Sequence, residues 1–219
     1  MYAKAREFQR KAPRQARARA TVEVLLEATA QVLVERGYAG LTTTRIAERA
    51  GVSVGTLYQY FEGKAELVRT VHQRQVARAF DALAHKALST EALAIAERIE
   101  QMLRALLEVK SARPSLSMAL HATMLELDGP AYLERTISQT QSLVGSVLEN
   151  HADDLRGVDL DLAAFVLTNA VDGVIEAAIA TDRLADPHLI EALTRLVLGY
   201  LDGASAKLRV SGSNATSPG

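Results

Sequence analysis

A short segment around Tyr58 brings together hydroxyl, amide and ammonium groups. Tyr58 and Tyr60 can present hydroxyl groups to phosphates, Gln59 can pair with an adenine edge, and the Thr56 methyl group can meet a thymine methyl group. Lys64, expected at the N-terminus of the following helix, adds a phosphate contact. Either tyrosine could instead be a core aromatic, but adjacent helical positions cannot all face inward. The combination indicates recognition of duplex DNA.

Two short helices separated by a glycine turn position these groups. Thr42 is expected to cap the first helix, whose Ala47 is small enough for the two helices to cross closely. Gly51 can adopt a positive φ at the turn. Ser53 is expected to cap the second helix, over residues 54–61. This pattern predicts a helix-turn-helix that presents its second helix to a DNA major groove.

Charge is divided unevenly along the chain. Residues 1–78 hold 14 Lys and Arg against 7 Asp and Glu, whereas residues 79–219 hold 11 against 19. A basic segment joined to an acidic body is typical of a nucleic-acid-binding domain attached to a domain with another role. Charge alone leaves open a chance run of basic residues.

Helical patterns cover almost the whole chain, so we expect an all-α fold with an N-terminal three-helix DNA-binding domain and a C-terminal helical ligand-binding and dimerisation domain. The expected organisation is a flexible basic arm (1–18), the helix-turn-helix domain (19–66), the ligand-binding and dimerisation domain (67–208) and a disordered tail (209–219). Beyond the fourth helix, helices are expected to begin at Ser89 or Thr90, Pro114, Ala131, Asp159 and Asp186-Pro187.

Several classes of protein are disfavoured by what the sequence lacks. It has no cysteine, which excludes disulfides and thiol catalysis, and its five histidines have no metal-ligand spacing. No hydrolase, P-loop or dinucleotide-binding motif is present. We therefore expect no catalytic residues, no metal and no cofactor. Without a long uncharged apolar run or a signal peptide, the expected location is the cytoplasm, away from the membrane.

The segment "GYAGLTTTRIAERAGVSVGTLYQYFEGKAELV" (37–68) closely resembles the DNA-binding segment of the tetracycline-repressor (TetR) family, and the similarity covers roughly residues 19–68. The resemblance implies an all-α homodimer that binds double-stranded DNA at a pseudo-palindromic operator and is released by a small-molecule effector. The family's DNA contacts map onto Thr43, Thr44, Arg45, Ser53, Val54, Gly55, Thr56, Tyr58, Gln59, Tyr60 and Lys64. No motif after about residue 80 identifies the effector.

Polar and methionine side chains inside apolar helices are the candidates for an effector pocket. They are Met118, His121, Met124, Asn169, Asp172 and Glu176. The methionines could equally be core residues, His121 a satisfied or solvent-facing histidine, and the two carboxylates a polar strip at a dimer interface. A buried carboxylate pair must meet a cation or raise its pKa. A pocket there therefore favours a cationic or hydrogen-bond-donating amphipathic effector.

The last two long helices, within residues 159–208, are apolar around much of their circumference, which predicts that they pack on the domain core and on a second subunit. The sequence thus predicts a ligand-responsive transcriptional regulator, a repressor. Two alternatives stay open: a helical small-molecule-binding or enzymatic protein with an incidental basic N-terminus, and a nucleoid-type DNA binder without a ligand.

Overall fold

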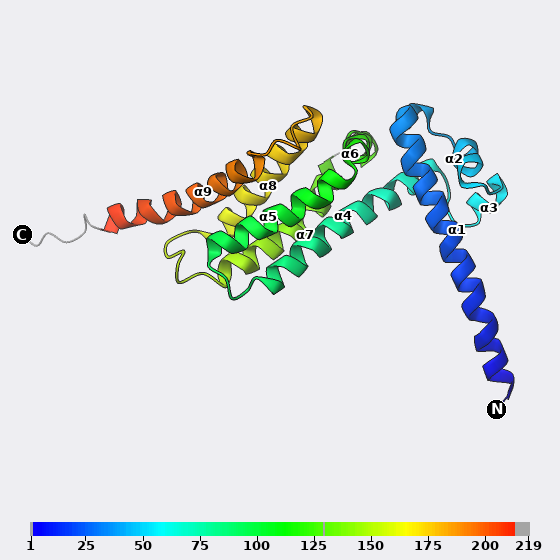
Figure 1. The fold of residues 1–219 in the computed structure, drawn as a ribbon, viewed down its shortest axis with the longest axis horizontal. Coiled ribbons are helices and arrows are strands. Elements are labelled where there is room, and N and C mark those ends of the chain that lie inside the picture. The colour runs from blue at the N-terminus through cyan, green and yellow to red at the C-terminus, as the bar shows by residue number, and fades with distance from the viewer. Residues whose placement is uncertain (1, 129, 213–219) are drawn as a thin grey trace, which may run out of the picture. The chain divides into compact units, whose positions relative to one another are not determined.

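The computed structural model describes the backbone of residues 2–128 and 130–212, and the side chains of residues 15–127 and 138–204. The described backbone is all-helical and contains no strand, as the sequence predicts (Figure 1). In chain order its helices are α1 (Tyr2–Gly40), α2 (Thr43–Ala50), α3 (Val54–Tyr58), α4 (Lys64–Ser89), α5 (Ile95–Ala112), α6 (Pro114–Asp128), α7 (Pro130–Glu149), α8 (Leu160–Ala180) and α9 (Leu189–Gly212).

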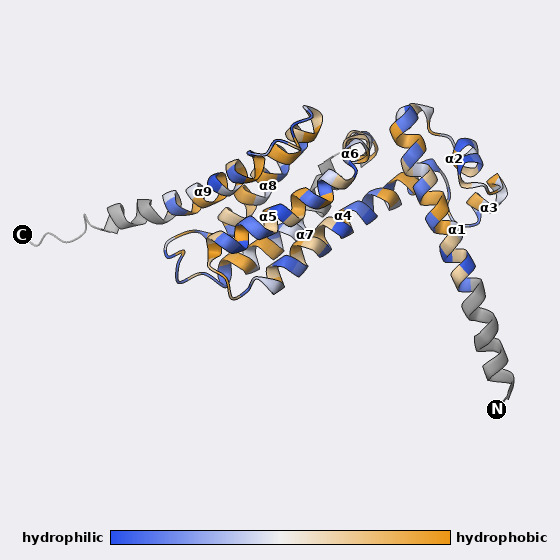
Figure 2. Cartoon of the chain, in the orientation of Figure 1, coloured by the Kyte–Doolittle hydropathy of each residue, from blue (hydrophilic) through white to orange (hydrophobic). Residues whose placement is uncertain are grey.

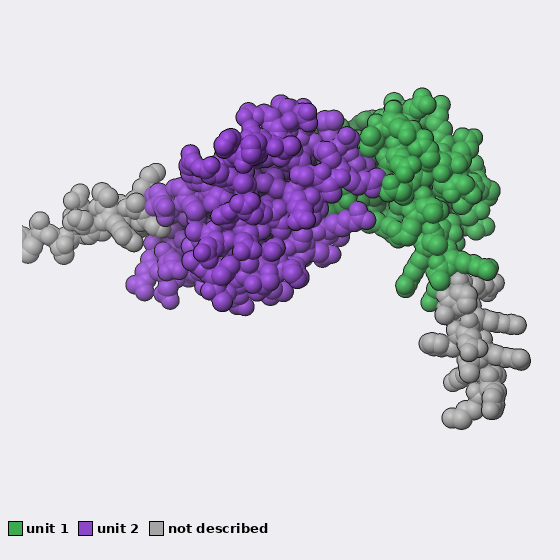
Figure 3. Space-filling view, in the orientation of Figure 1, with its two compact units in different colours: residues 1–75, 119–127 green, residues 76–118, 128–219 purple. Residues whose placement is uncertain are grey.

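The chain divides into two compact units (Figure 3). The first contains residues 1–75 and 119–127, and the second contains residues 76–118 and 128–219. The boundary falls inside α4, whereas the sequence placed the end of the DNA-binding domain at residue 66. That expected division of domains stays a prediction.

In the first unit, the N-terminal helix caps follow the sequence prediction. The side chain of Thr42 accepts a hydrogen bond from Arg45 N, and that of Ser53 accepts one from Thr56 N. Gly37 and Gly51 have positive φ angles of 64° and 69°, which glycine adopts without a steric penalty. α3 ends at Tyr58 rather than Phe61, and i→i+3 hydrogen bonds from Gln59 N to Thr56 O and from Tyr60 N to Leu57 O tighten the turn that follows it.

Two helix starts differ from the prediction. α4 continues to Ser89, and the hydroxyl groups of Ser89 and Thr90 bond backward to Lys86 O. These residues therefore complete α4, and α5 begins later, after Ala94, without a side-chain cap. Asp186 accepts from His188 N and holds the turn before α9, which begins at Leu189.

The two chain ends also bear on the prediction. α1 begins at Tyr2, so the backbone is helical where the sequence suggested a flexible basic arm. That stretch is rich in Ala, Arg, Gln and Lys, which favour helix without needing an apolar period. α9 extends to Gly212, and the remainder of the expected tail, residues 213–219, lies outside the described residues.

The second unit is built on an apolar cluster from α5, α7, α8 and α9, and hydrophobic residues recur along these helices (Figure 2). α8 begins where the sequence predicts a helix start, and Asp159 caps it by accepting from Leu162 N. Ala163, Ile175 and Leu193 are almost completely buried in this cluster. α8 is long and apolar enough to cross a membrane by length and composition alone. One side of α8, including Ala163 and Ile175, is buried in the cluster, and a core helix passes the same test, so α8 is weak evidence for a membrane span.

Candidate DNA interface and second-unit charge cluster

The turn between α2 and α3 has the close packing that a helix-turn-helix requires. Gly51 N bonds to Glu48 O, and Val52 N bonds to Ala47 O at 3.0 Å. Ala47 of α2 and Leu57 of α3 have no exposed surface, so each helix contributes one fully buried side chain to the core of the first unit. The opposite faces of α2 and α3 therefore lie at the surface of the unit.

Tyr58 lies on that surface, with 55% of its area exposed. Its hydroxyl group is 3.2 Å from Thr43 Oγ1, which joins the end of α3 to the start of α2. Gln59 is exposed and Tyr60 is half-buried, so the two tyrosines differ in their surroundings. Tyr58 and Gln59 are therefore exposed to a ligand as large as DNA, with Thr43 half-buried beside Tyr58.

The remaining residues of α3 surround its N-terminal cap. Thr56 Oγ1 lies 2.8 Å from Ser53 Oγ, so its hydroxyl group takes part in the cap. Val54 is half-buried beside it. Gly55 is exposed, and a Cβ added there would meet only Ser53 Oγ, at 3.7 Å. Glycine keeps this part of the surface low, which permits close approach of a phosphate backbone.

Two predicted DNA-binding cations contact carbonyl groups at the end of α1. Arg45 donates to Gly40 O at 2.8 Å, and Lys64 Nζ donates to Tyr38 O at 3.0 Å. Lys64 Nζ also lies 4.2 Å from the centroid of the Tyr38 ring. Both carbonyl groups lie beyond Gly37, where non-helical backbone angles interrupt α1. Arg45 and Lys64 thus each have a contact within the first unit. Thr44 is exposed.

Arg49 is a residue of this unit that the sequence did not single out. It donates from both terminal nitrogens to Glu35, at 2.8 and 2.7 Å. The hydrogen bond from Arg49 lowers the pKa of Glu35, and the same bond raises the pKa of Arg49. In the sequence, Glu35 and Arg49 are two opposite charges 14 residues apart. Such spacings are common, so this one did not identify the ion pair.

In the second unit, Asp172 and Glu176 share a cation that the sequence did not identify. Lys110 Nζ, on α5, lies 3.0 Å from Glu176 Oε1 and 3.5 Å from Asp172 Oδ1. Burial alone lowers the pKa of Lys110, but the charges of Asp172 and Glu176 and their hydrogen bonds outweigh it and raise that pKa. From the sequence we expected that a buried pair of carboxylates would either meet a cation or have a raised pKa. The structure places the cation Lys110 beside Asp172 and Glu176.

The other predicted effector residues have varied surroundings. Met124 is buried, Met118 is about half exposed and His121 is half-buried. Asn169 Nδ2 donates to Phe165 O of its own helix at 2.8 Å. His121 and Met124 belong to the first unit, and the others belong to the second. A pocket common to all six stays a prediction. Among the described residues, no group of three His, Cys, Asp or Glu is placed to hold a metal ion.

Two family models match the chain. One, described as bacterial regulatory proteins of the tetR family, covers residues 25–71, and the other, described as the tetracyclin repressor-like C-terminal domain, covers residues 94–201. Together they span both units, so the similarity extends well beyond the helix-turn-helix segment.

Curated relatives match the chain over different lengths. An HTH-type transcriptional repressor of Mycobacterium tuberculosis, KstR, is 26% identical over 186 residues, covering 82% of this chain and 81% of its own. The HTH-type transcriptional activator FasR of Mycolicibacterium smegmatis is 50% identical over 52 residues, which is 24% of each chain.

Solved structures share the fold of the chain. A transcriptional regulator from Pseudomonas aeruginosa PAO1 has a TM-score of 0.69 at 21% identity, covering 84% of this chain and 90% of its own. A TetR transcription regulator from Haloarcula marismortui has a TM-score of 0.69 at 23% identity, covering 84% and 97% respectively.

Proposed function

Because the chain belongs to the tetR family of bacterial regulatory proteins, we propose that this helix-turn-helix transcriptional regulator is a cytoplasmic repressor that binds a pseudo-palindromic operator as a homodimer. The surface formed by the exposed Tyr58 and Gln59 and the half-buried Thr43 carries the proposal. Hydroxyl and amide groups of this kind serve phosphates and base edges. The repressor role is favoured because the match to KstR covers most of both chains, whereas that to FasR covers a quarter.

Dimerisation is supported by apolar side chains on α8 and α9. Leu162 and Phe165 are three residues apart on α8 and are each about half exposed, and Leu196 of α9 is 39% exposed. Apolar groups repeated along a helix face are covered in many proteins by a second subunit. In the proposed dimer, two copies of α3 enter successive major grooves, about 34–36 Å apart.

We further propose that a small molecule bound in the second unit releases the protein from DNA. The cluster of Lys110, Asp172 and Glu176 has two negative charges and one positive charge. Its residual charge favours a cationic or hydrogen-bond-donating amphipathic effector over an anion. Binding there would shift α4, whose residues belong to both units, and change the spacing of the two recognition helices.

Selection of duplexes from a random pool, followed by a small-molecule screen on the recovered duplex, tests the proposal. We expect one palindromic motif to be enriched and some cationic amphipathic molecules to release it. The double variant Asp172→Asn/Glu176→Gln should keep its DNA affinity but respond less to those molecules. Release of both proteins by anions alone would contradict the proposed effector class.

A further inference from the structure

We infer that Arg49 is a positioning residue for DNA recognition, which fixes α2 on α1 and thereby sets the place of Thr43 and Tyr58 on the DNA-binding surface. The inference rests on the proposed function. Arg49 lies in the basic third of the chain, where an arginine would ordinarily be read as a phosphate contact. Its contacts with α1 indicate a different role.

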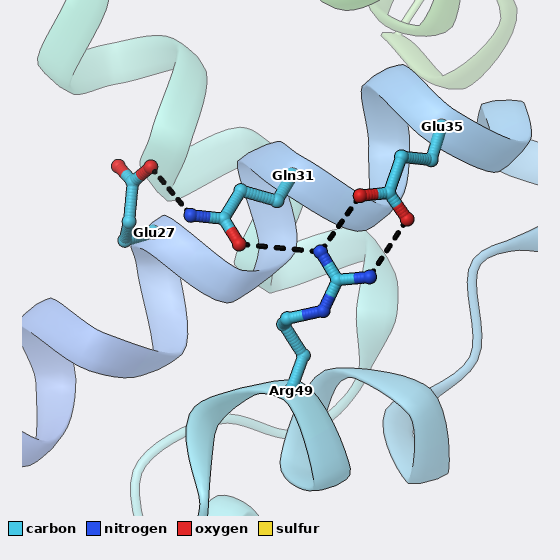
Figure 4. A network of polar contacts seen from close by, with 4 residues as sticks. All are labelled: Glu27, Gln31, Glu35 and Arg49. Carbon is cyan, nitrogen blue, oxygen red and sulfur yellow. Dashed lines mark hydrogen bonds and ion pairs between the residues drawn. The ribbon is translucent and has the colours of Figure 1, made fainter.

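The guanidinium group is held by side chains on one face of α1 (Figure 4). Nη1 and Nη2 of Arg49 donate to the two carboxylate oxygens of Glu35, and Nη1 also donates to Gln31 Oε1 at 3.2 Å. Gln31 Nε2 in turn donates to Glu27 Oε1 at 3.1 Å. Glu27, Gln31 and Glu35 are spaced four residues apart, so together they form a polar ladder along two turns of the helix.

α2 packs on α1 and contacts α3, but its buried face is small. It is eight residues long and buries only Ile46 and Ala47. A pair of adjacent apolar side chains leaves a short helix able to pivot about that contact. Arg45 attaches the N-terminal end of α2 to Gly40 O, and Arg49 attaches its C-terminal end to α1. Attachments at both ends oppose that pivot.

A rotation of α2 would move side chains of the proposed DNA-binding surface. Thr43 is the first residue of α2, and its hydroxyl group contacts the Tyr58 hydroxyl group of α3. Exposed ion pairs contribute little on average, but bidentate pairs within a network are the exception. Because both terminal nitrogens of Arg49 face Glu35, the role of this arginine is to orient α2.

The direction in which Glu35→Gln changes DNA affinity distinguishes a positioning role of Arg49 from a simple effect of charge. Glu35→Gln removes a negative charge from a DNA-binding unit, which by electrostatics alone raises affinity for every duplex. If Arg49 positions α2, Glu35→Gln should instead lower affinity for the selected duplex by about threefold to fivefold. Affinity for a scrambled duplex should stay the same or rise, so the ratio of the two affinities should fall.

Glu48→Gln is the matched control, because Glu48 is an exposed carboxylate on α2 outside the network. It should change both affinities alike and leave their ratio unchanged. Arg49→Lys adds a variant of equal charge that lacks the planar fork. It should lower the ratio without changing the dependence of binding on salt.

The experiment measures fluorescence anisotropy of the selected and scrambled duplexes with each full-length variant, after circular dichroism has confirmed equal helix content. The exchange Glu35→Arg/Arg49→Glu should recover most of the lost ratio. An equal change of both affinities in Glu35→Gln, or an unchanged ratio of affinities in Arg49→Lys, would overturn the inference. If the wild-type chain selects no duplex, the proposed function itself fails, which is a separate result.

Discussion

Lys64 and Tyr38 are joined by a hydrogen bond to the backbone carbonyl and by a contact with the ring face. An ammonium group has three N–H donors, so these contacts orient the group and leave donors for a phosphate. A lysine that is already oriented loses less side-chain entropy on binding DNA. At the scale of single residues, Lys64 can thus combine a structural contact with a DNA contact.

Lys64→Met should weaken binding to selected and scrambled duplexes alike. Losing one phosphate contact should reduce the slope of log affinity against log salt by about 0.9. Lys64→Arg, which keeps the charge, is the control and should retain the wild-type slope. An unchanged slope in Lys64→Met would limit Lys64 to its contact with Tyr38.

Lys110→Met should lower the free energy of unfolding by about 1–2 kcal/mol, because Asp172 and Glu176 lose their shared cation. The pKa of Lys110 is raised in the folded state. Its contribution is therefore complete below its unfolded pKa of about 10.4 and is lost as the pH rises through the folded value.

Thermal melts of the wild type and Lys110→Met at neutral and alkaline pH check this prediction. The difference in Tm should be largest near neutrality and should shrink at the alkaline end. Arg156→Met is the control, since Arg156 pairs with Asp153 in a highly exposed position. A difference in Tm that is no larger than that of the control would contradict the role of Lys110.

At the scale of elements, a buried arginine joins three segments of the second unit. Arg98, near the start of α5, donates to Ala87 O near the end of α4 at 2.8 Å. It also lies 3.2 Å from His151 Nε2, in the connection between α7 and α8. Since arginine can only donate, the histidine must accept at Nε2 and carry its proton on Nδ1, toward Asp154.

His151→Ala should destabilise the protein by about 1–3 kcal/mol, because a buried donor of Arg98 would lose its acceptor. His188→Ala, at an exposed histidine, should have a much smaller effect. Chemical denaturation of the three proteins measures the difference. Equal stability of both variants would show that the contact with Arg98 contributes nothing measurable.

The same elements show how far the sequence could predict the fold. Thr42 and Ser53 were identified as caps because an N-cap depends on a few neighbouring residues. Ser89 and Thr90 were misassigned because their hydroxyl groups can bond forward or backward. Local sequence alone does not decide between the two directions.

Side-chain partners distant in sequence were beyond prediction. The carboxylates of Asp172 and Glu176 were identified, but their cation lies more than 60 residues earlier, on α5. The ladder that holds Arg49 likewise depends on how α2 packs on α1. Motif spacing located the DNA-binding helices, whereas the contacts that orient them required the folded structure.

At the scale of the whole molecule, exposed apolar residues of α8 and α9 support a dimer. Phe165→Asp should yield monomers, because a charge would be buried at the proposed contact. Leu88→Asp, at a more exposed leucine of α4, is the control and should stay dimeric. Sedimentation equilibrium at micromolar concentration distinguishes the two. A monomeric wild-type chain would contradict the proposed dimer.

The affinity of the wild-type chain for its selected duplex, relative to a scrambled duplex of equal length, tests the central claim most directly. A helix-turn-helix regulator that reads base edges should bind the selected duplex at least about 10³-fold more tightly at physiological salt. Its affinity for both duplexes should fall steeply with salt. Equal affinity for the two duplexes, or no binding to either, would contradict the assignment of this chain as a sequence-specific regulator.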